Sequence, residues 1–332
     1  MKKIFFFFIV FIVSFSACET DFDVNANWKE TTIVYGLLDS SSDTQYVKIN
    51  KAYLGQGDAL MMAQFADSIN YNPNNLEVKI HKLGSSDTLM TIILDTIGIM
   101  KDSLDVNANS GIFSIENNII YKAVVPDGFL NKNHRYSITI KNLISGHKVN
   151  ANTEVISNFS FKNFSSAYKF GFYNPVMIID SLKFLSKTIQ WNKSDNGIIY
   201  QLDLIFNYSE NGFLKSLVWT QPLEVFSGSS MECTLEGKRF FNFLRQNLID
   251  DNTVVREFLD LSLVMTVGTE YLNTYMQVNE PITGIVQQRP QFTNINNGLG
   301  IFSSRYTYRK NGIGLTEDTR NYLTNELDRG FQ

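Results

Sequence analysis

The stretch YSITIKNLISGHKVNANTEV, residues 136–155, decides the fold class of this chain. Apolar side chains alternate with polar ones on both sides of the turn formed by Ser145 and Gly146. Alternation with a period of two is typical of a strand that has one buried face. The stretch therefore predicts a β-hairpin. Its inward-facing positions are Tyr136, Ile138, Ile140, Val149, Ala151, Thr153 and Val155.

The same alternation recurs through the N-terminal half, at residues 46–50 and 76–81, and residues 84–87 form a loop before an apolar stretch at 89–94. The hairpin at 136–155 resembles the closing hairpin of an immunoglobulin or fibronectin type III sandwich. The resemblance implies that Tyr136 is a tyrosine corner, a phenol buried against backbone. We predict a mainly β protein: an N-terminal sandwich of this type and a second β-rich domain with two or three short helices.

Two domains are expected because the chain exceeds what one core usually supports. We place the sandwich at residues 31–157 and the second domain, with its helical insertions, at residues 168–332. The boundary lies at residues 157–167, which are rich in Ser, Asn and Phe and do not alternate.

In the second domain, residues 188–191 lead through a turn at 192–197 into a strand at 200–208, which predicts a hairpin with Trp191 in the core. Helices are predicted at 238–248, at 270–279 and at 316–327, the last two with Thr269 and Thr316 as N-caps. We expect the helix at 270–279 to bury Tyr271, Leu272, Tyr275 and Met276. Between the first two helices, one buried strand face is formed by Leu259, Leu261, Leu263 and Met265.

The N-terminus has the pattern of an export signal. Two lysines precede an apolar run at residues 4–13, which is too short to span a bilayer as a helix. The residues Phe15, Ser16, Ala17 and Cys18 then resemble the lipobox of bacterial lipoproteins. This predicts a signal peptide at 1–17 and lipidation of Cys18; the alternative is an ordinary secretory cleavage site near that cysteine.

The lipidated cysteine would begin a tether at residues 18–30. Its acidic residues Glu19, Asp21 and Asp23 resemble the surface-export signals of Bacteroidota lipoproteins, and a plain solvated acidic tether is the alternative. Only Cys233 remains as a second cysteine, so the mature chain can form no internal disulfide. We interpret Cys233 as a small buried hydrophobic residue.

Composition and motifs exclude several kinds of chemistry. The chain has 29 Lys and Arg against 33 Asp and Glu, so nucleic acid is not an expected partner. The three histidines, His81, His134 and His147, lack the close spacing of zinc ligands, and no G-x-S-x-G motif is present. We therefore assign no catalytic, cofactor-binding or metal-binding residue.

Two weaker patterns favour turns over binding sites. The spacing of a calcium loop is met at Asn192, Ser194, Asn196, Gly197 and Asp203, but with mostly neutral ligands and between strands. The G-x-G at residues 298–300 lacks a third glycine and a following helix, so we interpret it as a tight turn before a strand.

Four strand motifs, together with the lipobox, resemble a domain-of-unknown-function family of Bacteroidota lipoproteins. They lie at residues 32–38, 46–54, 290–295 and 300–306. The resemblance implies a lipoprotein of the outer membrane or cell surface, in a family sometimes associated with TonB-dependent transporters. That family has no established catalytic residues.

We expect a protein anchored in the outer membrane by its N-terminal lipid and exposed at the cell surface. It would be a non-enzymatic binding or accessory protein, partnered by a TonB-dependent transporter or another envelope protein. The alternatives are a surface hydrolase acting on polysaccharide or peptide and an envelope assembly factor. No cofactor is expected, and the sequence does not identify the ligand.

Overall fold

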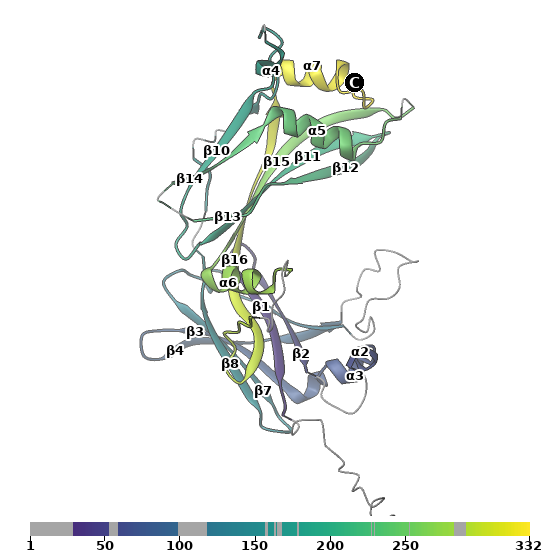
Figure 1. The fold of residues 1–332 in the computed structure, drawn as a ribbon. Helices are drawn as coiled ribbons and strands as arrows, with labels where there is room; N and C mark the ends of the chain where they lie inside the picture. The colour runs from purple at the N-terminus through teal and green to yellow at the C-terminus, as the bar shows by residue number, and fades with distance from the viewer. Residues whose placement is uncertain are drawn as a thin grey trace, which may run out of the picture.

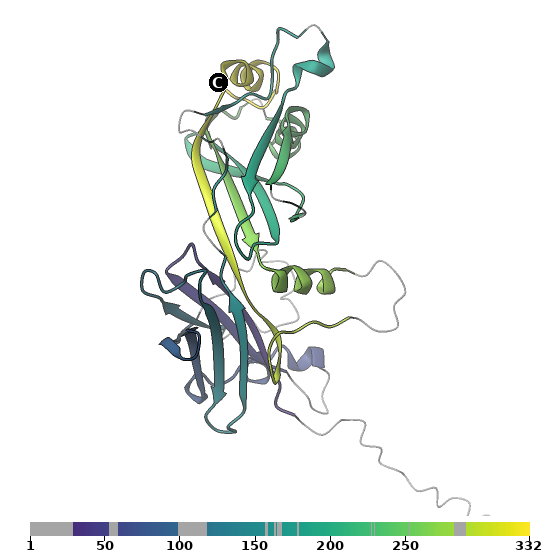
Figure 2. The ribbon, with the colours of Figure 1, turned by 90° about the vertical axis from the view of Figure 1, so that its left-hand side faces the viewer.

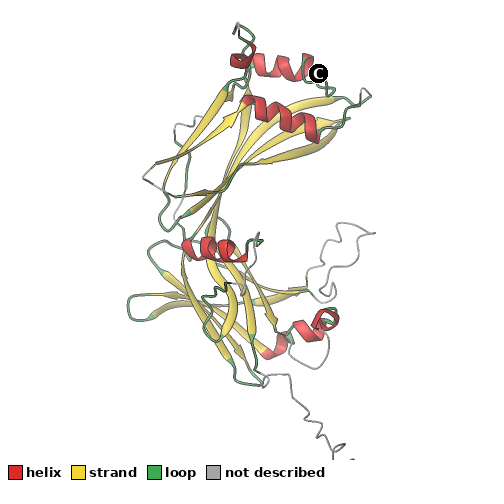
Figure 3. Cartoon of the chain, viewed as in Figure 1, coloured by secondary structure: helices red, strands yellow, loops and turns green. Residues whose placement is uncertain are grey.

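The structure is a computed structural model that describes residues 29–332 except 53–58, 99–117, 157–158, 163, 165–167, 178, 227, 229, 252 and 282–289. The predicted signal peptide, lipobox and acidic export residues lie outside the described residues. The fold is mainly β, as predicted, with two lobes stacked end to end (Figures 1 and 3).

The strands are β1 (Thr32–Asp39), β2 (Thr44–Lys51), β3 (Leu76–Leu83), β4 (Thr88–Ile93), β5 (Asp95–Gly98), β6 (Ile119–Val124), β7 (Arg135–Asn142), β8 (Lys148–Glu154), β9 (Lys169–Phe170), β10 (Ser186–Asn192), β11 (Ile199–Glu210), β12 (Phe213–Thr220), β13 (Glu224–Val225), β14 (Ser230–Glu236), β15 (Arg256–Gly268) and β16 (Gly298–Leu315). The helices are α2 (Ala59–Met62), α3 (Ala66–Ile69), α4 (Asp180–Lys183), α5 (Gly237–Asn247), α6 (Glu270–Asn279) and α7 (Glu317–Asn325), with a 3-10 turn at Pro73–Asn75.

The first lobe is a two-sheet sandwich. One sheet has the order β4-β3-β7-β8, and the other is formed by β1, β2, β6, β5 and the first half of β16. Alternate residues of both sheets meet in one buried cluster, so the period-two pattern does mark the core. The cluster includes Val34, Val47, Ile49, Val78, Ile80, Tyr136, Ile138, Ile140, Val149, Ala151 and Phe302.

The hairpin predicted at residues 136–155 is confirmed by the antiparallel pairing of β7 with β8. Tyr136 is fully buried, and its hydroxyl donates to the Phe129 carbonyl at 2.6 Å and accepts from the Asn131 N–H at 2.7 Å. The phenol therefore holds the turn that precedes β7, as a tyrosine corner does.

We expect Tyr136→Phe to lower the free energy of unfolding by about 1–3 kcal/mol, because it leaves the buried Phe129 carbonyl and the partly buried Asn131 N–H without their partner. Urea unfolding measures this. As the matched control, Tyr46→Phe removes the hydroxyl of a residue that is 48% exposed, and its effect should stay within about 0.5 kcal/mol. Equal effects of the two substitutions would mean that the Tyr136 hydroxyl does not stabilise the lobe.

Strand β16 connects the lobes. Its first half, from Gly298 to Arg305, pairs in parallel with β1, and its second half pairs antiparallel with β15 (Figure 2). Phe302 from this strand is fully buried in the core of the first lobe. The domain limits 31–157 and 168–332 stay a prediction. The pairing of β16 with β1 places residues 298–305 in a sheet of the first lobe.

The second lobe is built on the antiparallel strands β12, β11, β15 and the second half of β16. The pair β10–β14, helix α5 and helix α7 complete its core, in which Trp191 is 1% exposed, as predicted. The predicted helices near 238–248 and 316–327 are present as α5 and α7. Both bury apolar residues: Phe240, Phe241 and Leu244 from α5, and Tyr322 and Leu323 from α7.

The prediction that the strands on either side of residues 192–197, β10 and β11, pair as a hairpin is wrong. Strand β10 pairs with β14, and β11 pairs with β12, β13 and β15. The turn is present, with the Ser194 N–H donating to the Tyr200 hydroxyl at 2.9 Å, but it joins strands of two different sheets. The rings of Trp191 and Tyr200 pack at 5.9 Å between centroids, so the two strands meet through side chains and not through backbone hydrogen bonds.

The predicted burial of Leu259 is also wrong. The pairing of β11 with β15 shifts register between Asn207 and Tyr208, where Leu259 is the extra residue. Such a β-bulge breaks the alternation of faces. Leu259 is therefore 45% exposed, while Leu261, Leu263 and Met265 are fully buried.

Helix α6 has the predicted position but not the predicted burial, since none of its residues is buried and both Tyr271 and Met276 are 40% exposed. Thr269 occupies the predicted N-cap position, but its side chain makes no capping hydrogen bond, because its hydroxyl pairs with that of Ser303 at 2.5 Å. Thr316 likewise occupies the predicted N-cap position of α7 without a capping hydrogen bond from its side chain, and its hydroxyl pairs with that of Thr319.

Candidate functional site

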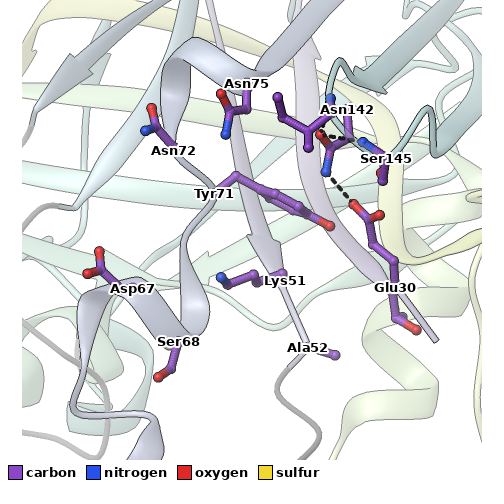
Figure 4. A pocket seen from close by; sticks show the side chains of 12 residues that line it. Glu30, Lys51, Ala52, Asp67, Ser68, Tyr71, Asn72, Asn75, Asn142 and Ser145 are labelled. Atoms are coloured by element: carbon purple, nitrogen blue, oxygen red, sulfur yellow. Dashed lines mark hydrogen bonds between the residues drawn. The ribbon is translucent and has the colours of Figure 1, made fainter. Parts of the chain in front are cut away.

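A polar cavity of about 570 Å³ lies where the chain enters strand β1 of the first lobe (Figure 4). Its volume is in the range of small-ligand pockets. Its polar groups are the carboxylates of Glu30 and Asp67, the amine of Lys51, the amides of Asn72, Asn75 and Asn142, and the hydroxyls of Thr31, Ser68, Tyr71 and Ser145.

Turns built by asparagine side chains hold two walls of this cavity. The Asn72 side chain accepts from the Asn74 N–H at 3.0 Å, and Pro73 begins the 3-10 turn. At the β7–β8 turn, the Asn142 side-chain oxygen accepts from the Ile144 N–H at 3.0 Å. Asn and Pro favour such turns because a short side chain mimics a backbone acceptor and a ring presets φ.

The wall beside Glu30 is a closed hydrogen-bond network. Asn142 donates through Nδ2 to Glu30 Oε1 at 2.7 Å, and the Tyr71 hydroxyl pairs with that of Thr32 at 2.9 Å. Burial raises the pKa of Glu30, but hydrogen bonds from Ser145 and Asn142 and the nearby His147 outweigh it, so the pKa is lowered overall. Glu30 is therefore an ionised carboxylate at neutral pH.

The pKa of Tyr71 is shifted in the opposite direction to that of Glu30. Burial raises the pKa of its phenol to about 12, and the neighbouring Glu30 carboxylate adds to this effect. The phenol therefore stays neutral at neutral pH and can act as a hydrogen-bond donor. Tyr71 and Glu30 together form a hydrogen-bonded wall that carries the negative charge of the Glu30 carboxylate.

The opposite side of the cavity presents unengaged polar groups. Neither the Lys51 ammonium nor the Asp67 carboxylate has a hydrogen-bond or ion-pair partner among the described residues, and the same holds for the side chains of Ser68 and Asn75. Lys51 is half-buried and Asp67 is exposed. Figure 4 shows Lys51 and Tyr71 between Asp67 on one side and Glu30 on the other.

A second cavity of about 510 Å³ adjoins the first and shares with it Lys51, Asp67, Tyr71 and Asn72. It extends past these residues to the small or apolar side chains of Ala66, Pro73 and Ile119. We call the two cavities together the Lys51–Asp67 groove.

A smaller cavity of about 310 Å³ lies between the lobes, and its lining includes Arg135, Glu154, Lys193 and Glu270. Both of its cations are already engaged. Arg135 lies 3.7 Å from Glu154, and the Lys193 ammonium lies 4.1 Å from the centre of the Phe226 ring. The groove is therefore the stronger candidate site.

The residues singled out in the sequence do not converge on a site. Cys233 lies on β14 opposite Ile189 and is half-buried; burial raises the pKa of its thiol to about 11, which makes the thiol a poor nucleophile. His81 pairs with Thr91, and His134 contacts the Leu83 carbonyl.

The residues at the calcium-loop spacing are also separated. The Asn196 side chain donates to the Val155 carbonyl at 3.0 Å, and Asp203 lies on strand β11. Within the part of the chain that the structure describes, no group of three His, Cys, Asp or Glu side chains could hold a metal ion. Nor does that part contain a helix long and apolar enough to cross a membrane.

No motif in the sequence marks the groove. Glu30 was placed at the end of the tether, whereas it lies in the cavity wall. Lys51, Asp67 and Tyr71 come from three separate segments and match no motif. The Asn-Pro-Asn-Asn turn at residues 72–75 was the one local signal, since it marks a turn with exposed amides.

No protein-family model and no curated protein matches the chain. Among solved structures, the chain is similar to a DUF4785 family protein from Legionella pneumophila, with 12% identity and a TM-score of 0.21. The match covers 70% of this chain and 52% of that one, so the chain spans about half the length of that protein. A structural similarity this low assigns no role to any residue of the groove.

Proposed function

We propose that this protein is an outer-membrane lipoprotein, anchored by acyl chains on Cys18 and exposed at the cell surface. It acts as a non-enzymatic binding or accessory protein. The observation that carries the proposal is the apolar run at residues 4–13 followed by Phe15, Ser16, Ala17 and Cys18. Acyl chains contribute about 0.8 kcal/mol for each buried CH₂ group, which suffices to hold a protein on a membrane without a spanning helix.

The position of the groove supports a binding role close to the membrane. Glu30, in the groove wall, is only 12 residues from Cys18 (30 − 18 = 12). A fully extended chain of that length spans at most about 40 Å. A ligand in the groove would thus lie near any channel or transporter in the same membrane, which fits a TonB-dependent transporter as partner.

The hydrolase alternative is less well supported. Glycoside hydrolysis needs a carboxylic acid that stays protonated near neutral pH, beside an ionised carboxylate. The two carboxylates that line the groove are Glu30, whose pKa is lowered, and Asp67, which is exposed. Neither has the environment of a general acid.

We expect Cys18→Ala to move the protein from the membrane fraction to the soluble fraction, because it removes the acylated thiol. Incorporation of a labelled fatty acid and fractionation of cells measure the change. Cys233→Ala removes the other cysteine and should leave the protein in the membrane. A Cys18→Ala protein that keeps its label and its membrane association would overturn the anchor.

Surface exposure and partnership need a second experiment on the full-length protein with a C-terminal tag. We expect protease added to intact cells to remove the tag, and a TonB-dependent transporter to co-purify from gentle membrane extracts. A protected tag without a transporter would contradict the surface role and favour an envelope assembly factor that faces the periplasm.

A further inference from the structure

We propose that the Lys51–Asp67 groove binds a short peptide with free termini, pairing the peptide carboxylate with Lys51 and the peptide ammonium with Asp67. This inference rests on the proposed binding role and names the class of ligand.

Opposite charges in the groove favour a ligand that carries both a negative and a positive group. Glu30 is ionised, but its carboxylate already accepts hydrogen bonds from Asn142 and Ser145, so it depends less on a cation from a ligand. Lys51 and Asp67 carry opposite charges, line both cavities and have no partner among the described residues. A ligand with one negative and one positive group can satisfy both, and charge-assisted hydrogen bonds of this kind are about twice as strong as neutral ones.

The extent of the groove and its neutral lining also favour a peptide. The two cavities share four lining residues, so the space extends on both sides of Lys51 and Asp67. The Asn75 amide in one cavity has an uncommitted donor and acceptor, which is the pair of functions that a peptide bond requires. Small or apolar side chains at Ala52, Ala66 and Pro73 line the same space and can contact uncharged peptide side chains.

The aromatic content of the groove argues against a carbohydrate. Sugar rings stack on exposed aromatic faces, and a platform of several rings is the usual arrangement. Tyr71 is the aromatic residue among those that line the two cavities, and its hydroxyl is already held by Thr32 and Glu30. Its fixed ring forms one wall and not a platform.

Equilibrium dialysis of the full-length lipidated protein in detergent tests the proposal, with mass spectrometry to quantify what is bound. The probes are a library of di- to tetrapeptides of uncharged residues with free termini, the same library acetylated and amidated, and a neutral glucose tetrasaccharide. We expect the free library to be retained about fivefold or more above the other two probes. Lys51→Gln and Asp67→Asn should each reduce that retention by about fivefold or more.

The matched controls are Lys238→Gln and Glu280→Gln, which make the same charge changes at exposed positions that do not line the groove. They should retain the free library as the unaltered protein does. Because Lys51 and Asp67 have no partner among the described residues, all four variants should unfold at the same temperature, which excludes a folding defect as the cause.

Each contrary result has a definite meaning. Equal retention of free and blocked peptides would overturn the pairing of termini with Lys51 and Asp67. Retention of the tetrasaccharide alone would overturn the peptide class while leaving the binding role intact. If no probe is retained, the groove is not the binding site, whereas the lipid anchor is judged separately by the Cys18→Ala fractionation.

Discussion

Replacing Gly300 with alanine is expected to unfold the first lobe in most molecules, with a loss of more than about 4 kcal/mol. Gly300 has φ +102°, where an L side chain costs about 1–3 kcal/mol. In addition, a Cβ there would lie 2.0 Å from the Val34 carbonyl oxygen. Since Val34 is fully buried in β1, the clash can be relieved only by breaking the pairing of β1 with β16.

Hydrogen–deuterium exchange of residues 32–39 and 298–305 measures this effect, and rapid exchange in both segments is expected. Gly312→Ala is the control on the same strand. It also has a positive φ, +73°, but nothing lies within 4 Å of the new Cβ, so it should cost only about 1–2 kcal/mol. Equal protection of the two variants would show that the close approach of β1 and β16 at Gly300 is not required for folding.

The same substitution tests whether the lobes fold as one unit. Phe302 connects the core of the first lobe to a strand whose other half lies in the second. Trp191 and Trp219 both lie in the second lobe and report its packing by fluorescence. If β16 couples the lobes, the fluorescence of Trp191 and Trp219 should change at a lower urea concentration in Gly300→Ala than in Gly312→Ala.

Local patterns in the sequence predicted local structure well. The hairpin at 136–155 needs only a turn and two alternating strands that are neighbours in sequence, and it is present as β7–β8. The pairing partner of β10 was predicted wrongly, because the choice between β11 and β14 depends on how whole sheets pack. Alternation at 200–208 is compatible with either partner, so it could not identify the correct one.

Two other errors have local causes that periodicity does not detect. One extra residue in β15 turns Leu259 outward, and a β-bulge has no clear signature in a run of apolar residues. The apolar pattern of α6 correctly predicts a helix but assumes a core beneath it. In the structure α6 has few neighbours, mainly on β16, and its apolar side chains remain partly exposed.

The groove could not be predicted for a related reason. Glu30 precedes β1, Lys51 ends β2, Asp67 lies in α3 and Asn142 ends β7. The pairing of β1 with β2, the contact of α3 with β2 and the hydrogen bond from Asn142, at the β7–β8 turn, to Glu30 bring these residues together. No spacing in the sequence encodes that arrangement.

Removing the carboxylate of Glu210 is expected to lower the free energy of unfolding of the second lobe by about 3 kcal/mol. Arg256 is 1% exposed, and its Nε donates to Glu210 Oε2 at 2.8 Å. Among the described residues, Glu210→Ala leaves this buried guanidinium with the Arg329 carbonyl, at 2.6 Å, as its acceptor. Breaking a buried ion pair costs about 3–5 kcal/mol, and we expect about 3 kcal/mol because Glu210 is partly exposed.

Urea unfolding measures the loss, followed by the fluorescence of Trp191 and Trp219 for the second lobe and by far-UV circular dichroism for both lobes. The control is Glu154→Ala, which breaks the exposed pair with Arg135 at 3.7 Å and should change stability by less than about 0.5 kcal/mol. The double variant Glu210→Ala with Arg256→Met should regain part of the loss, since it removes the unpaired charge. A Glu210→Ala protein as stable as Glu154→Ala would contradict a stabilising role for the pair.

The pH dependence of stability provides an independent check on Glu210. A hydrogen bond from Lys215 lowers the pKa of the Glu210 carboxyl; burial opposes this, and Arg256 lowers it further, so the folded pKa lies below the ordinary value of 4.5. A carboxyl of this kind binds its proton more readily in the unfolded chain. Its contribution is therefore fully present above about pH 4.5 and is lost as the pH falls through the folded pKa. The difference in unfolding free energy between the unaltered protein and Glu210→Ala should thus shrink between pH 6 and about pH 3, and a constant difference would mean that the Glu210 charge is not what stabilises the lobe.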